Sequence, residues 1–300
     1  MKKLTHFYIT LFLLPYLLKS QPVPQPDVDK VQLSRFLIIT GAGYAVTQAG
    51  LYSLWYKDQQ SQSFQFFDDS QQWKQVDKAG HFYTAFHLSQ LGSHAFHRAG
   101  IDEQKCHWYG ALMGTLMLLP IEIFDGYSEA YGFSWSDVAA NTMGAAFLPI
   151  QYKIWHEVRI QPKFSFHRTD FPKLRPNTLG KSWYEEIIKD YNGQTYWLSF
   201  DLYRFFPKSA IPKWINLAIG YGAENMVYAR ERENEAYGLQ AYRQYYLAPD
   251  IDFSHFRQPP TSLGNKLLNG VLYVANLIHL PAPTLSYEAG RGLRFYPLYF

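Results

Sequence analysis

The stretch DKAGHFYTAFHLSQLGSHAFHR, residues 77–98, decides the fold of the first half of the chain. It predicts a helix, with Asp77 in the N-terminal turn, where the helix dipole favours an acid, and with Gly100 as a stop signal just past its end. Lys78 and His81 lie in the same first turns. Charged side chains are rarely buried without partners, because losing hydration costs on the order of several kcal/mol per ion. The stretch therefore predicts both a helix and part of an internal polar site.

Three further helices are predicted around it. Residues 35–56 form a long apolar run with small residues, and residues 106–124 are apolar on most faces. A fourth helix begins at Ser134-Trp135-Ser136-Asp137, which is close to a capping box, and runs to about residue 156. Because the connections are short, we expect a four-helix bundle-like domain.

Polar pairs occur on three of these helices at spacings that share a helix face. Asp77 and His81 form one pair, and the other two helices carry Glu122 with Asp125 and Asp137 with Asn141. In an up-down bundle the end of the third helix meets the starts of the second and fourth. We therefore expect one polar cluster at one end of the bundle, and its candidate residues are Asp77, Lys78, His81, Glu122, Asp125, Ser134, Asp137 and Asn141.

One imidazole and several carboxylates permit more than one kind of chemistry. They could bind one divalent metal ion, the only cofactor that the sequence suggests, with His81, Glu122, Asp125 and Asp137 as ligands. They could instead carry out acid–base chemistry, with His81 as the proton partner of a carboxylate. A buried network that fixes helix register, or a site for a ligand or lipid headgroup, fits the same residues. No catalytic residue is assigned.

The second half of the chain has a different pattern. Runs with partial alternation predict strands at residues 196–205, 215–221, 242–253 and 284–299, whereas residues 161–177 contain three prolines and are expected to be irregular. Short helices are predicted at residues 181–190 and 262–277. The expected fold class is α+β, mainly α, with the helical bundle followed by several antiparallel strands and short helices.

The N-terminus predicts export. A basic start, a short apolar core and Ser20 before Gln21 are typical of a secretory signal peptide over residues 1–20. That segment contains three of the 28 basic residues, so its removal leaves 25, which balance the 25 acidic residues. The basic pI therefore does not indicate nucleic-acid binding. The single cysteine, Cys106, lies far from the expected cleavage site and is not expected to carry a lipid anchor.

Three ordered blocks of sequence carry a family resemblance. Residues 77–82 (DKAGHF), Glu122-x-x-Asp125 and the block SWSDVAAN at 134–141 followed by Gly144 resemble the uncharacterised YfiM-type family of predicted periplasmic (lipo)proteins. They are more distantly similar to VanZ-like membrane proteins, which are associated with cell-envelope biology. The resemblance covers roughly residues 35–155 and implies no established reaction.

These observations lead to one interpretation and one alternative. We expect an uncharacterised, membrane-associated cell-envelope protein, in the periplasm or outer membrane of a Gram-negative bacterium, with a structural or ligand-binding polar site. The alternative is a metal-dependent hydrolase that acts on a lipid or cell-wall substrate, so enzymatic activity is left open. A membrane is the expected partner, and the sequence names no protein partner. The expected organisation is a signal peptide (1–20), a Pro-rich leader (21–34), a helical domain (35–158) and an α+β region (159–300).

Overall fold

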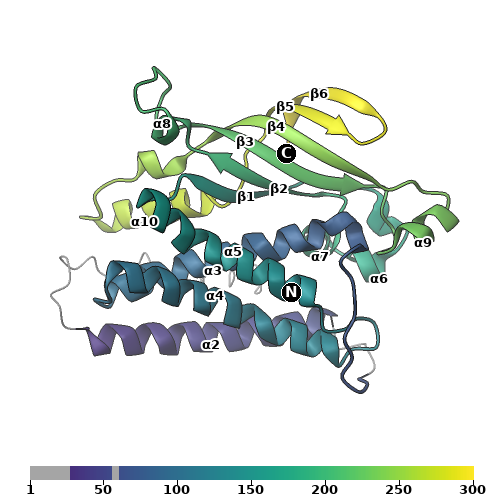
Figure 1. Ribbon diagram of the computed structural model, residues 1–300, viewed down its shortest axis with the longest axis horizontal. Helices are drawn as coiled ribbons and strands as arrows, with labels where there is room; N and C mark the ends of the chain where they lie inside the picture. Colours follow the sequence, from purple (N-terminus) through teal and green to yellow (C-terminus); the bar gives the residue numbers. More distant parts are fainter. Residues whose placement is uncertain (1–27, 56–60) are drawn as a thin grey trace. The chain divides into compact units, whose positions relative to one another are not determined.

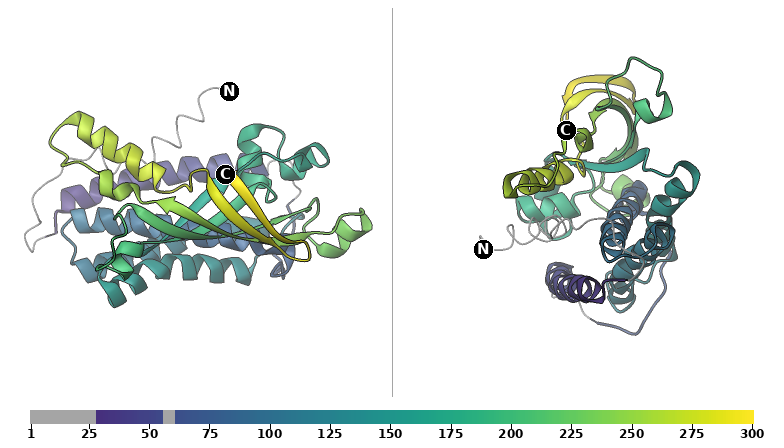
Figure 2. Two further views of the ribbon diagram at one scale, coloured as in Figure 1. Left: turned by 90° about the horizontal axis from the view of Figure 1, so that it is seen from above. Right: turned by 90° about the vertical axis from the view of Figure 1, so that its left-hand side faces the viewer.

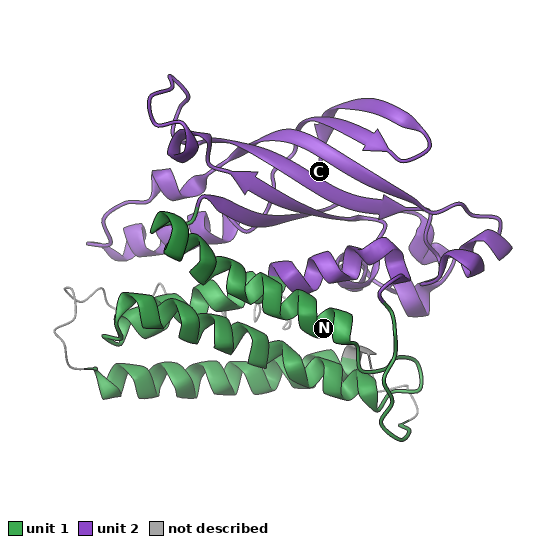
Figure 3. Ribbon diagram, in the orientation of Figure 1, with its two compact units in different colours: residues 1–69, 84–158 green, residues 70–83, 159–300 purple. Residues whose placement is uncertain are grey.

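The computed structural model describes residues 28–55 and 61–300, so the predicted signal peptide and most of the predicted leader lie outside the described residues (Figure 1). The chain forms two compact units (Figure 3). The helical unit consists of the described parts of Met1–Asp69 together with Thr84–Val158, and the sheet unit consists of Ser70–Tyr83 and Arg159–Phe300. The predicted class, α+β and mainly α, is confirmed.

Four long helices make up most of the described helical unit, to which α3 belongs from Thr84 onward: α2 (Lys30–Trp55), α3 (Val76–Arg98), α4 (Glu103–Gly126) and α5 (Trp135–Trp155). The predicted signals act as expected at two ends. Gly100 adopts a positive φ of 85° after α3, and Ser134 caps α5 by accepting a hydrogen bond from the Asp137 amide. Pro120 lies inside α4, which continues past it to Gly126.

Close contacts between small residues hold the helices together. Ala85, Leu118 and Ala145, from α3, α4 and α5, share one buried apolar cluster. At Gly110 of α4 an added Cβ would lie only 2.4 Å from the carbonyl oxygen of Ser89 on α3. The two backbones can approach this closely only because position 110 has no side chain. Helix α2 joins the unit through Tyr44, whose hydroxyl donates a hydrogen bond of 2.8 Å to a carbonyl of α4.

The sheet unit contains six antiparallel strands in the order of the sequence. The strands are β1 (Ile160–Phe166), β2 (Gln194–Phe200), β3 (Ile215–Glu224), β4 (Tyr242–Ile251), β5 (Ala282–Glu288) and β6 (Gly292–Tyr299). The short helix η1 (Gln72–Gln75) of this unit precedes α3. Short helices connect the strands: η2 (Phe171–Lys173), α6 (Pro176–Leu179), α7 (Trp183–Lys189), α8 (Leu202–Phe205), α9 (Glu231–Ala236), η3 (Phe253–Phe256) and α10 (Leu263–Ala275).

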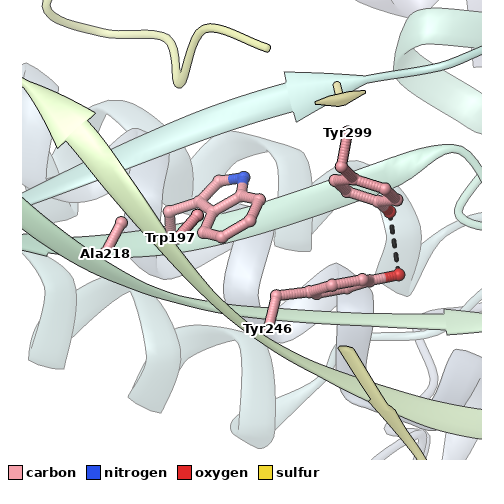
Figure 4. Close-up of a cluster of buried hydrophobic side chains, with 5 residues drawn as sticks. Trp197, Ala218, Tyr246 and Tyr299 are labelled. Carbon is pink, nitrogen blue, oxygen red and sulfur yellow. Dashed lines mark hydrogen bonds between the residues drawn. The ribbon is translucent and has the colours of Figure 1, made fainter. Parts of the chain in front are cut away.

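The sheet is strongly curved, and its concave side encloses aromatic rings (Figures 2 and 4). Trp197, Tyr246 and Tyr299 are buried together there with two alanines. The Tyr299 hydroxyl donates a hydrogen bond of 2.8 Å to the Tyr246 hydroxyl (Figure 4). Rings from β2, β4 and β6 therefore meet inside the curve.

The structure corrects three expectations for this half. The segment expected to be irregular contains β1, which tolerates Pro162 because β1 lies at the end of the strand order. The strand expected at 196–205 ends at Phe200, after which Asp201 caps α8 through the Arg204 amide. The strand expected at 284–299 is two strands, joined by a turn in which Gly290 and Gly292 adopt positive φ.

Candidate functional site

Two of the predicted acids are deeply buried in the helical unit. The Glu122 side chain, near the end of α4, is 0% exposed, and Asp137, in the first turn of α5, is 5% exposed. Asn141, one turn further along α5, is 1% exposed. Carboxylates at this depth are stable only when positive charge or hydrogen bonds compensate the lost hydration.

The start of α5 is organised by an acid that the sequence analysis missed. Asp69 accepts hydrogen bonds of 2.6 Å from the Ser134 hydroxyl and 2.7 Å from the Ser136 hydroxyl. Ser134 in turn accepts a hydrogen bond of 3.1 Å from the amide of Asp137. Asp69 lies in a polar connection without periodicity, so no pattern in the sequence set it apart from its neighbours.

Asp125 is only half-buried, three residues after Glu122. Its negative charge adds to the effect of burial on Tyr131, and together they raise the pKa of that phenol to about 12. Burial is the larger cause. Asp125 therefore faces the loop that follows α4, which is a less enclosed environment than that of Glu122.

The other three candidates, Asp77, Lys78 and His81, lie in the first turns of α3, which group with the sheet unit. The Lys78 ammonium lies 3.0 Å from the Asp77 carboxylate, and both side chains are largely buried. Gly80 is fixed against β2, since an added Cβ would lie 2.7 Å from the Tyr196 hydroxyl oxygen. His81 is half-buried one turn after Asp77. The meeting of these residues with the buried acids of α4 and α5 stays a prediction.

A second group of candidate metal-binding side chains lies wholly within the sheet unit. Asp201, Asp252 and His255 offer donor atoms within 4.8 Å of one another. Arg204 already occupies this place, with its Nε 2.8 Å from Asp201, and the His255 ring lies 3.5 Å from Asp252. Because the acids have basic partners, this group serves as an ion-pair cluster at the ends of β2 and β4.

Among the helices of residues 28–55 and 61–300, none combines the length and the apolar character that are needed to cross a membrane.

Comparisons with known proteins give one match. The chain matches no curated protein and no solved structure. Residues 65–153 match the family described as predicted periplasmic lipoprotein (DUF2279), and this segment contains every predicted site residue. Cys106 is buried in α4, so it is not the acylated cysteine that the word lipoprotein implies. The match supports an uncharacterised family of exported, periplasmic or outer-membrane proteins, while the YfiM-type and VanZ-like resemblances stay predictions.

Proposed function

We propose that this chain is a membrane-associated cell-envelope protein that binds one divalent metal ion through His81, Glu122 and Asp137, with Asp125 as an accessory ligand. The observation that carries the proposal is the complete burial of Glu122 on α4. A carboxylate in that position calls for positive charge or hydrogen bonds nearby, and a bound cation would supply the positive charge. An imidazole with carboxylates is a ligand set that suits zinc and similar ions.

The charge balance of the sequence supports a bound cation. Neither lysine nor arginine occurs between Lys105 and Lys153, although that segment contains four acids: Glu122, Asp125, Glu129 and Asp137. Between Lys105 and Lys153, the two helices that carry the buried acids therefore contain neither lysine nor arginine.

Helix geometry supports His81 as the third ligand. Ala85, Leu118 and Ala145 pack together in the helical unit. Glu122 lies one turn beyond Leu118, while Asn141 and Asp137 lie one and two turns before Ala145. His81 lies one turn before Ala85 on the same continuous helix. In the up-down arrangement that the sequence predicts, each of these steps would lead toward the same end of the bundle.

The test is metal analysis of the purified mature protein beside three variants. We expect near-stoichiometric metal in the native protein and in Glu129→Gln, an exposed acid of the same segment that serves as the control. We expect at least about a tenfold loss of metal in His81→Ala and in Glu122→Gln, because mutation even of a residue that only supports a metal ligand typically costs about 10- to 100-fold in metal affinity. Circular dichroism of each variant shows whether it still folds.

Metal-free native protein would overturn this proposal and leave a polar network that fixes the helix register. Metal that is retained by both ligand variants would overturn the assignment of these residues. Metal that is lost in the folded ligand variants would supply the precondition for the alternative, a hydrolase that acts on a lipid or cell-wall substrate.

A further inference from the structure

The sheet unit exposes the apolar face of its central strands. On β3, β4 and β5 the outward residues are between 37% and 50% exposed, and they are Leu217, Ile219, Tyr245, Leu247, Leu285 and Tyr287. The residues that alternate with them are buried, and several of them are polar: Asn216, Gln244, Asp250, Thr284, Ser286 and Glu288. A sheet in water normally buries its apolar face and exposes its polar one. Here the exposed face of the central strands is apolar, while the buried side holds both polar side chains and aromatic rings.

The buried polar side is a built network and not a result of poor packing. Lys163 and Asp250, both almost completely buried, form an ion pair of 2.7 Å between β1 and β4. Ser199 donates a hydrogen bond of 2.6 Å to Asp250, and the Trp197 indole donates one of 2.9 Å to Ser165. Since several of the buried polar side chains bond to one another inside the sheet unit, the apolar face is the side that remains for a partner.

The register of the strands arranges this face in rows. Tyr221, Tyr245 and Tyr287 are directly paired across β3, β4 and β5. The next row along the strands, Ile219, Leu247 and Leu285, is aliphatic. On the side of the aliphatic row away from the tyrosines, Trp214 directly precedes β3, and its ring contacts Phe256. Aromatic rings at both borders of an aliphatic band are typical of surfaces that meet the interface of a lipid bilayer.

The charge beside this face has one sign. The segment that leads into β3, residues 202–214, contains Arg204, Lys208 and Lys213 and no acid. Both lysines are exposed, together with Phe206 and Trp214. Basic residues next to exposed aromatic rings complement anionic lipid headgroups, to which each exposed lysine adds attraction.

We propose that the apolar face, formed by the outward residues of β3, β4 and β5, docks on a lipid bilayer with anionic headgroups through its aliphatic rows and the 202–214 segment. Six outward positions of this face carry no charge, and the only polar groups among them are tyrosine hydroxyls. A protein partner would require more, because protein interfaces contain about one hydrogen bond per 100–200 Å². This surface is separate from the proposed metal site, so either proposal can fail alone.

The test is flotation of the full mature chain with two kinds of vesicle. One kind contains phosphatidylcholine alone, and the other contains phosphatidylcholine with about one third phosphatidylglycerol, which resembles an anionic membrane surface. We expect the native chain to float with the anionic vesicles. Leu247→Glu with Leu285→Glu is expected to lower the bound fraction at least about tenfold, since each substitution removes an aliphatic group from the lipid and adds a charge. Leu174→Glu, at a 50% exposed position outside the strands, is the control and is expected to bind like the native chain.

A second variant separates the charges from the apolar rows. Lys208→Glu with Lys213→Glu leaves every strand unchanged and is expected to abolish the preference for anionic vesicles. The proposal is overturned if the native chain does not float, or if the leucine variant, folded by near-ultraviolet circular dichroism, floats as well as Leu174→Glu. It is also overturned if the native chain is a dimer without lipid and the leucine variant is a monomer with unchanged flotation, because the face would then be an interface between copies.

Discussion

Buried carboxylates occur in both units, and the two units provide for them differently. In the sheet unit, Asp250 has its own lysine, since Lys163 lies 2.7 Å away and a serine donates a further hydrogen bond. In the helical unit, Glu122 is buried as deeply, but α4 and α5 contribute neither lysine nor arginine between residues 105 and 153. The comparison teaches that an acid whose base is built into the same strands belongs to the fold. For an acid whose own helices supply neither lysine nor arginine along that segment, the positive charge comes from elsewhere, and the proposed metal ion would contribute to it.

Removing the lysine of the sheet unit is the strongest way to break this comparison. We expect Lys163→Met to destabilise the protein by about 3–5 kcal/mol, because Asp250 would be left as an uncompensated buried charge. Urea unfolding measures the loss. The matched control is Lys173→Met, whose ion pair with Asp170 is exposed on both sides and is expected to contribute nothing measurable. Equal effects of the two substitutions would contradict the role of the buried pair.

Helix packing in the helical unit gives the next largest effect. We expect Gly110→Ala to cost about 1–3 kcal/mol, because its Cβ would meet backbone atoms of α3 at 2.4 Å and 2.6 Å. Gly41→Ala on α2 is the matched control, with nothing within 4 Å of its added Cβ. It is expected to stabilise the protein by about 0.5–1 kcal/mol, since alanine is the better helix former. Thermal unfolding checks that the two substitutions change the stability in opposite directions. The packing account fails if both substitutions stabilise the protein.

The pH dependence of stability gives a smaller effect in the sheet unit. Burial lowers the pKa of His279, whose ring stacks on Trp197 at 3.9 Å. The folded state therefore binds this proton less readily than the unfolded state, and stability falls as pH drops below about 6.5, the ordinary pKa of histidine. We expect His279→Phe, which keeps an aromatic ring stacked on Trp197, to reduce the loss of folding stability between pH 7 and pH 5.

Other histidines set the background for that measurement. His167 and His107 also have pKa values lowered mainly by burial, so some loss of stability with acid is expected to remain in His279→Phe. An unchanged slope in the variant would show that His279 does not contribute to the pH dependence.

The sequence predicted the helices of the bundle because their signals are local. Apolar periodicity, the Ser134 cap and Gly100 each act within a few residues, and the four helices begin and end close to the expected positions. β1 was missed because its prolines suggested an irregular segment, and the tolerance of Pro162 depends on the place of β1 in the sheet. Such tertiary context is not visible in a short window of sequence.

The candidate site and the sheet faces show the same limit. Helix phase correctly indicated burial of Glu122, Asp137 and Asn141. It did not find Asp69, because that acid reaches Ser134 from a connection without regular structure. Alternation in β3 and β4 divided the residues between two faces, but it could not tell which face is buried. The structure shows that the more polar face is buried together with aromatic rings, and that the apolar face is exposed, against the usual preference.

The most direct test of the central claim is thermal unfolding of the full mature chain before and after removal of divalent metal by a chelator. A bound cation at Glu122 predicts that chelation lowers the unfolding temperature of the native protein and that added metal restores it, because a ligand that binds only the folded state stabilises it. The same treatment should leave folded Glu122→Gln unchanged. An unfolding temperature of the native protein that does not respond to chelation or to added metal would contradict the account.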